Sequence, residues 1–91
     1  MKRYIALINE IAEEMKRGDE VVWEKRPKEM RWCWKNLNTG RERFLRLTEV
    51  SRMQNRDDIC FETVMDFILG RKNALEAQLM IEKLPKLKAF L

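Results

Sequence analysis

The feature that most constrains this chain is a pair of strand-like segments separated by a short turn, between residues 30 and 47. Aromatic side chains, which favour strands, lie on both sides of the turn. The Asn-Thr-Gly sequence at 38–40 is typical of a three-residue hairpin loop, and its glycine can adopt the positive φ that such a loop requires. We therefore predict an antiparallel hairpin with strands at Met30–Asn36 and Glu42–Leu47.

A three-residue loop would fix the register of this hairpin, meaning which residues lie opposite each other. The predicted partners are Leu37 and Arg41, Lys35 and Arg43, Trp34 and Phe44, Cys33 and Leu45, Trp32 and Arg46, and Arg31 and Leu47. Because side chains alternate between the two faces of a strand, one face should carry Met30, Trp32, Trp34, Phe44 and Arg46. The opposite face should carry Arg31, Cys33, Lys35, Arg43, Leu45 and Leu47. A slip of one residue in the loop would exchange these partners.

The segment before the hairpin predicts a helix and then a first strand. Apolar residues recur at helical spacing through Lys2–Arg17, and Gly18 lies where a left-handed cap would end the helix. The apolar stripe predicts a core-facing surface, with a partner-binding face as the alternative. Val21–Trp23 favours a strand, which should end at Arg26–Pro27 because proline cannot donate a hydrogen bond to the sheet.

The segment after the hairpin predicts two further helices. Asp57 or Asp58 should begin the first, since negative charge is favourable in the first turn of a helix. Asn73 and Glu76 have the spacing of a capping box for the second, which Pro85 should end at about Leu84. Residues 48–55 are compatible with a short turn or an exposed loop.

These elements together predict the fold class. We expect a single small α+β domain over residues 1–91, with an N-terminal helix, a three-stranded antiparallel sheet and two C-terminal helices packed on one face of the sheet. The chain is 45% hydrophobic and 37% charged. That composition is too apolar for a disordered tail.

The sequence gives little support for catalysis or for metal binding. It contains no histidine, which is the commonest general base and metal ligand. Cys33 and Cys60 fit no zinc-binding spacing. Adjacent carboxylates at Asp57 and Asp58 would point about 100° apart on a helix, so they do not make a natural two-carboxylate site. We expect a non-enzymatic protein with no cofactor and no metal.

The N-terminal segment lacks the unbroken apolar run of a signal peptide, because Asn9 and Glu10 interrupt it. No apolar run approaches the roughly 20 residues that span a bilayer. We therefore expect a cytoplasmic, intracellular protein with reduced cysteines and no membrane partner.

The basic residues are concentrated in the middle of the chain. The net charge of the whole protein is +4, but residues 21–56 contain ten basic and four acidic residues, so the remainder is slightly acidic. Seven of those ten basic residues are arginines. Arginine forms forked contacts with phosphate or carboxylate groups better than lysine does.

A basic sheet with interleaved aromatic residues is typical of nucleic-acid binding, because aromatic rings stack on bases and cations hold the backbone. The candidate binding residues are Lys25, Arg26, Lys28, Arg31, Trp32, Trp34, Lys35, Arg41, Arg43 and Arg46. Stacking on single strands requires that Trp32, Trp34 and Phe44 face solvent. If those aromatics form the core instead, a phosphate-contacting sheet would suit duplex or structured RNA.

We take nucleic-acid binding as the leading hypothesis, and a second function class, consistent with the same residue types, is its main alternative. Tryptophan and arginine dominate the energetics of protein interfaces. The chain could therefore be a small interaction module or inhibitor that binds an acidic partner protein through the same surface or through its helices. The C-terminal helices could also form a homodimer.

Overall fold

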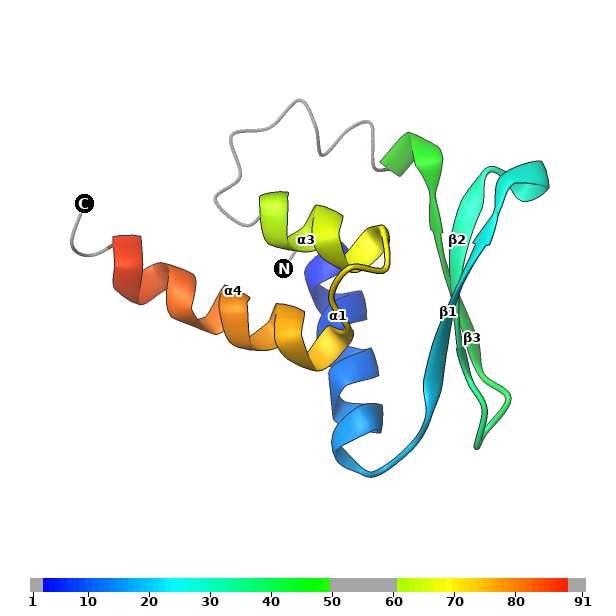
Figure 1. Cartoon of the computed structure of the whole chain (residues 1–91), viewed down its shortest axis with the longest axis horizontal. Helices are drawn as coiled ribbons and strands as arrows, with labels where there is room; N and C mark the ends of the chain where they lie inside the picture. The colour runs from blue at the N-terminus through cyan, green and yellow to red at the C-terminus, as the bar shows by residue number, and fades with distance from the viewer. Residues whose placement is uncertain (1–2, 50–60, 89–91) are drawn as a thin grey trace.

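The computed structural model describes residues 3–49 and 61–88, with side chains described for residues 4–49 and 61–83. The elements are α1 (Arg3–Lys16), β1 (Val21–Arg26), the 3₁₀ turn η1 (Pro27–Glu29), β2 (Arg31–Asn36), β3 (Glu42–Arg46), α3 (Phe61–Ile68) and α4 (Ala74–Lys88). The three strands form an antiparallel sheet in the order β1-β2-β3. The helices all lie on one side of this sheet (Figure 1). The predicted α+β architecture is confirmed.

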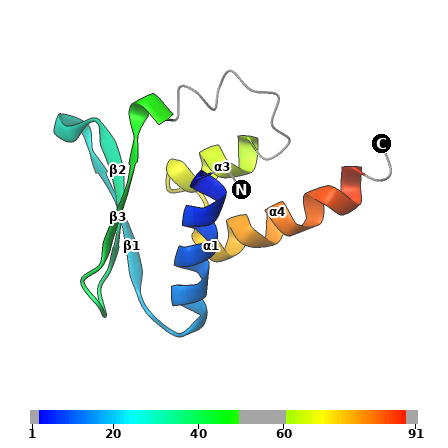
Figure 2. The same ribbon diagram turned by 180° about the vertical axis from the view of Figure 1, so that it is seen from behind.

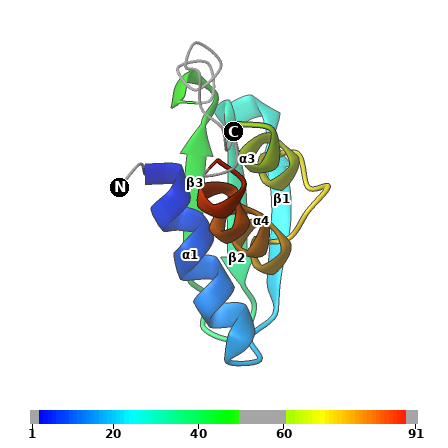
Figure 3. The same ribbon diagram turned by 90° about the vertical axis from the view of Figure 1, so that its left-hand side faces the viewer.

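Helix α1 ends where the sequence predicted. Gly18 has a φ of +95° and donates its backbone N–H to the carbonyl of Met15 at 3.0 Å. A left-handed residue at this position satisfies the last carbonyls of a helix, and glycine adopts it without a steric penalty. The short turn that follows leads directly into β1. Figure 3 shows α1 lying in front of the sheet.

The hydrophobic core lies between the inner face of the sheet and the helices. Trp32, Trp34 and Leu45 project from the sheet and are at most 6% exposed. The ring of Trp34 stacks on that of Phe67 in α3, with centroids 4.7 Å apart and planes within 3° of parallel. The apolar stripe of α1, including Ile8 and Ile11, completes this core. Of the two interpretations of that stripe, the core-facing one is therefore correct.

The predicted hairpin register is wrong by one residue. The structure pairs Trp32 with Leu45, Cys33 with Phe44 and Trp34 with Arg43. The loop contains four residues, 37–40, because the N–H of Asn36 bonds to the carbonyl of Arg41 at 2.8 Å. As a result, Phe44 and Arg46 lie on the outer face of the sheet, and Arg43 and Leu45 lie on the inner face.

The side chain of Asn36 explains why the loop is longer than predicted. Its Oδ1 accepts hydrogen bonds from the backbone N–H groups of Asn38 and Thr39, at 2.9 and 3.0 Å. An asparagine that begins a turn commonly bonds to the backbone two residues further along. Gly40 does have the predicted positive φ, +77°, but it ends a four-residue loop.

The turn between β1 and β2 begins at the predicted place. Strand β1 ends at Arg26, and Pro27 opens η1. Met30 was predicted to begin the second strand, but it has a left-handed backbone with a φ of 54° and lies in the turn. Strand β2 therefore starts at Arg31.

The C-terminal helices agree with the sequence except at their ends. The capping box is present, since Glu76 N–H donates to Asn73 Oδ1 at 2.9 Å and Asn73 N–H donates to Glu76 Oε1 at 3.2 Å. Helix α4 continues to Lys88, so the prediction that Pro85 ends it is wrong. Pro85 lies in the last turn of α4, where a proline removes only one backbone hydrogen bond, the one to the carbonyl four residues earlier. The helix can therefore continue past it. The predicted helix start at Asp57 or Asp58 lies outside the described residues. Of the segment predicted as a turn or a loop, residues 48 and 49 are described, and they are helical together with residue 47.

Replacing Phe67 with alanine should destabilise the protein by about 3–5 kcal/mol, because it removes a fully buried ring and leaves a cavity beside Trp34. Urea denaturation followed by tryptophan fluorescence measures this change. The matched control is Leu37→Ala in the hairpin loop, where the side chain is half exposed. It should change the free energy of unfolding by less than about 1 kcal/mol. Equal effects of the two substitutions would contradict this description of the core.

Candidate nucleic-acid interface

The outer face of the sheet is arranged in three rows that cross the strands. The strand register places Arg26, Arg31 and Arg46 side by side in one row, next to η1. We call these three residues the arginine row. The middle row is Glu24, Cys33 and Phe44, and the third is Val22, Lys35 and Glu42.

The arginine row brings like charges together on neighbouring strands. Cross-strand neighbours of the same sign destabilise a sheet, by a few tenths of a kcal/mol to about 1 kcal/mol per pair. Such an arrangement is unfavourable for the fold unless anions lie close to it. An anionic ligand would therefore bind this face most favourably at the arginine row, where it would reduce the repulsion between like charges.

Glutamates of the chain already neutralise part of the row. Arg31 donates to Glu29 Oε2 from Nε at 2.6 Å, and its Nη2 is also 2.6 Å from that oxygen. Arg26 contacts Glu24 at 3.1 Å, Glu42 at 3.3 Å and Glu29 at 3.9 Å. The hydrogen bond to Glu24 is the largest cause of the raised pKa of Arg26.

Arg46 differs from the other two arginines of the row. Its side chain is exposed and makes no ion pair with any other described residue. A carboxylate still lies close to it, because the backbone N–H of Arg46 donates to Glu49 Oε2 at 3.2 Å. Within the described residues, the row therefore has three cations, of which Arg26 and Arg31 form side-chain ion pairs.

An apolar platform lies next to the arginine row. The guanidinium of Arg31 lies 3.9 Å from the centroid of the Phe44 ring, and that of Arg26 lies at 5.4 Å. Stacking on an aromatic ring holds a planar guanidinium in place while leaving its edge free to donate. Beside Phe44, the thiol of Cys33 is completely buried, and burial raises its pKa although Arg26 and Arg31 oppose this.

Four of the other predicted cations are exposed, but they are spread around the sheet. Lys35 lies on the outer face, and Lys28 lies in η1 beside the arginine row. Lys25 lies on β1 opposite Trp32, at the edge of the inner face. Arg41 lies at the opposite end of the sheet, after the hairpin loop. The structure thus brings Arg26, Lys28, Arg31 and Arg46 together and separates Arg41 from them.

The predicted stacking residues Trp32 and Trp34 are not on this surface. They are 6% and 3% exposed and face the helices, so they cannot stack on bases in the folded protein. Trp23 is the partly exposed tryptophan, at 39%, but its Nε1 donates to the carbonyl of Ile68 at 2.8 Å on the helical side. Phe44 is the aromatic residue that faces outward, which the wrong register concealed.

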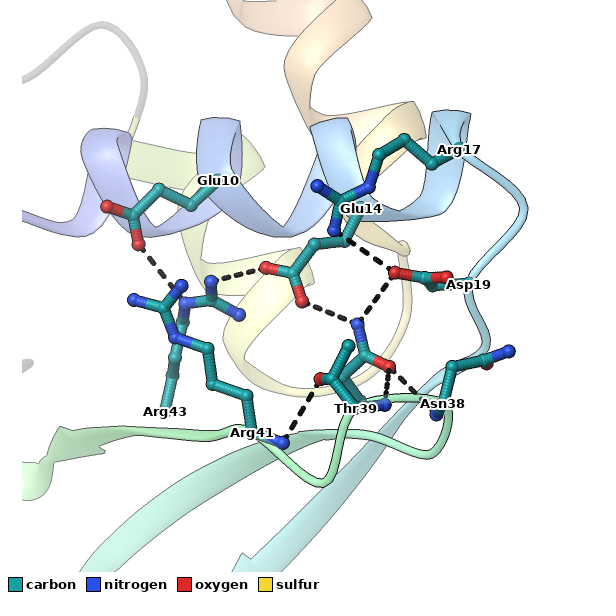
Figure 4. Close-up of polar contacts among 9 residues, drawn as sticks. Glu10, Glu14, Arg17, Asp19, Asn38, Thr39, Arg41 and Arg43 are labelled. Carbon is teal, nitrogen blue, oxygen red and sulfur yellow. Dashed lines mark hydrogen bonds and ion pairs between the residues drawn. The ribbon is translucent and has the colours of Figure 1, made fainter.

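The predicted phosphate ligand Arg43 is also corrected by the structure. Its guanidinium points inward, is 8% exposed, and pairs with Glu14 through Nη2 and with Glu10 through Nε at 3.1 Å (Figure 4). Asn36 Nδ2 donates to the same Glu14 carboxylate at 2.6 Å and to Asp19 at 3.1 Å. Arg43 therefore ties α1 to the sheet and is not available to a ligand.

Hydrogen bonds to the buried Glu14 carboxylate keep its pKa low. Burial acts to raise the pKa of Glu14, but hydrogen bonds from Arg43 and Asn36 and the charges of Arg43 and Arg41 lower it on balance. The pKa of Asp19 is also lowered, chiefly by its hydrogen bond from Asn36. A carboxylate with a lowered pKa stabilises the folded protein at neutral pH and loses that contribution as the pH falls through its folded-state pKa.

Replacing Glu14 with glutamine should destabilise the protein by about 3 kcal/mol at neutral pH, because it leaves the buried Arg43 charge without its closest partner. The loss should shrink as the pH falls from the ordinary glutamate pKa of about 4.3 toward the lowered folded-state pKa of Glu14, because the wild-type carboxylate becomes protonated over that range. Thermal or urea unfolding at a series of pH values measures both effects.

The matched control is Glu13→Gln, which removes the same charge from an exposed position on α1 where Glu13 pairs with Lys16. Its effect should be below about 1 kcal/mol. A Glu14→Gln protein as stable as this control would show that the buried ion pair contributes nothing to the fold.

Comparisons with models of protein families, with curated proteins and with solved structures gave no significant match to this chain. Among the described residues, no group of three or more Cys, Asp or Glu side chains could hold a metal ion. No helix in the described ranges is both long and apolar enough to cross a membrane.

Proposed function

We propose that this protein is a non-catalytic binder of duplex or otherwise structured nucleic acid, and that it binds the phosphate backbone through the outer face of its sheet. The observation that carries this proposal is the arginine row, with Lys28 in the adjoining η1. Three guanidinium groups on adjacent strands repel one another in the free protein, so an anion would relieve that repulsion. Phosphate contacts of this kind fix a protein on nucleic acid without reading its sequence.

The position of the aromatic residues favours a duplex over a single strand. Single-strand binding relies on bare aromatic rings on which successive bases stack. On the outer face, the described aromatic residue is Phe44, and one face of its ring is covered by Arg31. Contacts to phosphates remain, and these suit double-stranded nucleic acid.

The dimensions of the row agree with a duplex ligand. Neighbouring strands lie about 4.8 Å apart, so three strands place the outer arginines about 10 Å apart. The major groove of a DNA duplex is about 12 Å wide, which is close to this spacing. The sheet could therefore lie against a groove with its arginines toward the flanking phosphates.

A salt titration of a fluorescently labelled duplex and of one of its strands tests this proposal. Affinity measured by anisotropy should fall steeply with salt, and the duplex should bind more tightly than the single strand, because cations are available and stacking rings are not. Binding of neither ligand at low salt would contradict the proposal. The same cations would then indicate an acidic partner protein, which is the alternative function.

The Arg46→Gln substitution extends this test to the row itself. Loss of one phosphate contact should weaken duplex binding and reduce the slope of log affinity against log salt by about 0.9. The control is Lys83→Gln, which removes an exposed cation from α4. An equal change in slope for both variants would mean that binding follows overall charge and not the outer face.

Self-association through α4 is a second proposal, and it depends on a different surface. Leu79 and Met80 of this helix are 56% and 40% exposed, which is high for large apolar side chains. Helix α4 packs on α1 and α3 near its start and then extends away from the sheet (Figure 2). A second copy could cover the exposed residues.

If this dimer forms, sedimentation should show a concentration-dependent increase in mass, which Leu79→Glu abolishes by placing a charge in the apolar contact. The matched control is Leu37→Glu, since Leu37 is also half exposed but lies in the hairpin loop. A wild-type protein that remains monomeric at all concentrations would contradict the dimer and leave the nucleic-acid proposal unaffected.

A further inference from the structure

One carboxylate lies between two arginines of the row, Arg26 and Arg31. Oxygen Oε2 of Glu29 is 2.6 Å from both Nε and Nη2 of Arg31, and 3.9 Å from Nη1 of Arg26. Arg31 therefore holds this oxygen through two nitrogens, and Arg26 adds a longer ion-pair contact. Arginine also forms charge-assisted hydrogen bonds with the phosphate or carboxylate oxygens of ligands.

The backbone of the turn determines where this carboxylate lies. Glu29 is the last residue of η1, and the following residue, Met30, has a positive φ of 54°. Met30 is the one non-glycine residue with a positive φ among those described. Its N–H donates to the carbonyl of Pro27 at 3.1 Å, and its carbonyl accepts from Leu47 N–H at 3.0 Å. These two bonds hold the unusual backbone conformation of the residue that joins Glu29 to Arg31.

The arginines are held independently of Glu29. Arg31 stacks on Phe44, and Arg26 also contacts Glu24 and Glu42. The side chain of Glu29 is 45% exposed, so it can rotate into solvent without disturbing the sheet. If it does so, Arg26 and Arg31 keep their other contacts beside an open anion site, and Arg46, whose side chain forms no ion pair with another described residue, lies on the next strand.

We propose that the position of Glu29 Oε2 is a phosphate subsite, and that Glu29 competes with the ligand for it. A phosphate oxygen would replace the carboxylate oxygen at Arg31 and Arg26, and Arg46 would add a third cation from the neighbouring strand. This proposal deepens the proposed function, because it names the contact that a nucleic-acid phosphate would make. It also means that Glu29 lowers the affinity of the free protein for anions.

Neutralising Glu29 tests this competition. Glu29→Gln should bind a duplex about two- to fivefold more tightly than wild type at low salt, since a competing exposed ion pair is removed. The slope of log affinity against log salt should become steeper by about 0.9, because the released arginines take one more phosphate.

The control is Glu13→Gln, which changes the net charge by the same amount on exposed α1. It should leave both the affinity and the slope close to wild type. Melting curves of both variants establish that the fold is retained. If Glu29→Gln and Glu13→Gln have the same effect, or if wild type binds a duplex and Glu29→Gln binds no better, the subsite is overturned while nucleic-acid binding stands.

A second measurement separates the subsite from the proposed function. Inorganic phosphate can be titrated into wild type and Glu29→Gln while NMR follows the Nε–H signals of the arginines. The signals of Arg31 and Arg26 should shift at lower phosphate concentration in the variant. If they do and no duplex binds, the subsite stands and nucleic-acid binding fails. If phosphate shifts neither signal in either protein, the subsite is overturned.

Discussion

The rest of the structure depends on the hydrogen bonds that the side chain of Asn36 makes. Its carbonyl oxygen accepts two loop amides, and its amide nitrogen donates to Glu14 and Asp19. A buried amide that uses both ends in this way fixes the loop length and joins the hairpin to α1. Because loop length determines register, this one residue decides which side chains of β3 face inward and which face outward.

The core and the candidate interface are consequences of the same register. In the observed pairing, Leu45 packs beside Trp32 and Trp34, while Phe44 and Arg46 lie on the outer face. A one-residue slip would exchange those positions. The inner face also receives Arg43, and the acidic residues of α1 make that charge tolerable. The strand register that places Arg46 in the outer arginine row therefore also buries Arg43 on the inner face.

The sequence predicted the elements and the fold class because their signals are local. Helical spacing, Gly18, Pro27 and the Asn73 capping box each act within a few residues, and all four lie where expected. The register and the site depend on contacts that are distant in sequence. Asn36 bonds Glu14 across 22 positions, and Arg43 bonds Glu10 across 33. Arg43 and Arg46 were predicted on opposite faces of the hairpin, but no local pattern shows which of the two arginines is buried.

The outer face also shows how a modest net charge can coexist with a strong local one. Glu24, Glu29 and Glu42 lie among the arginines, and they reduce the repulsion that the row creates. These exposed ion pairs contribute little to stability individually, so a phosphate can replace them at small cost. A face that carried the same arginines without acids would bind any polyanion and would fold less readily. Interleaved glutamates therefore protect the fold. Under the proposed function, they would also moderate affinity and make the strength of binding depend on how many of them the ligand displaces.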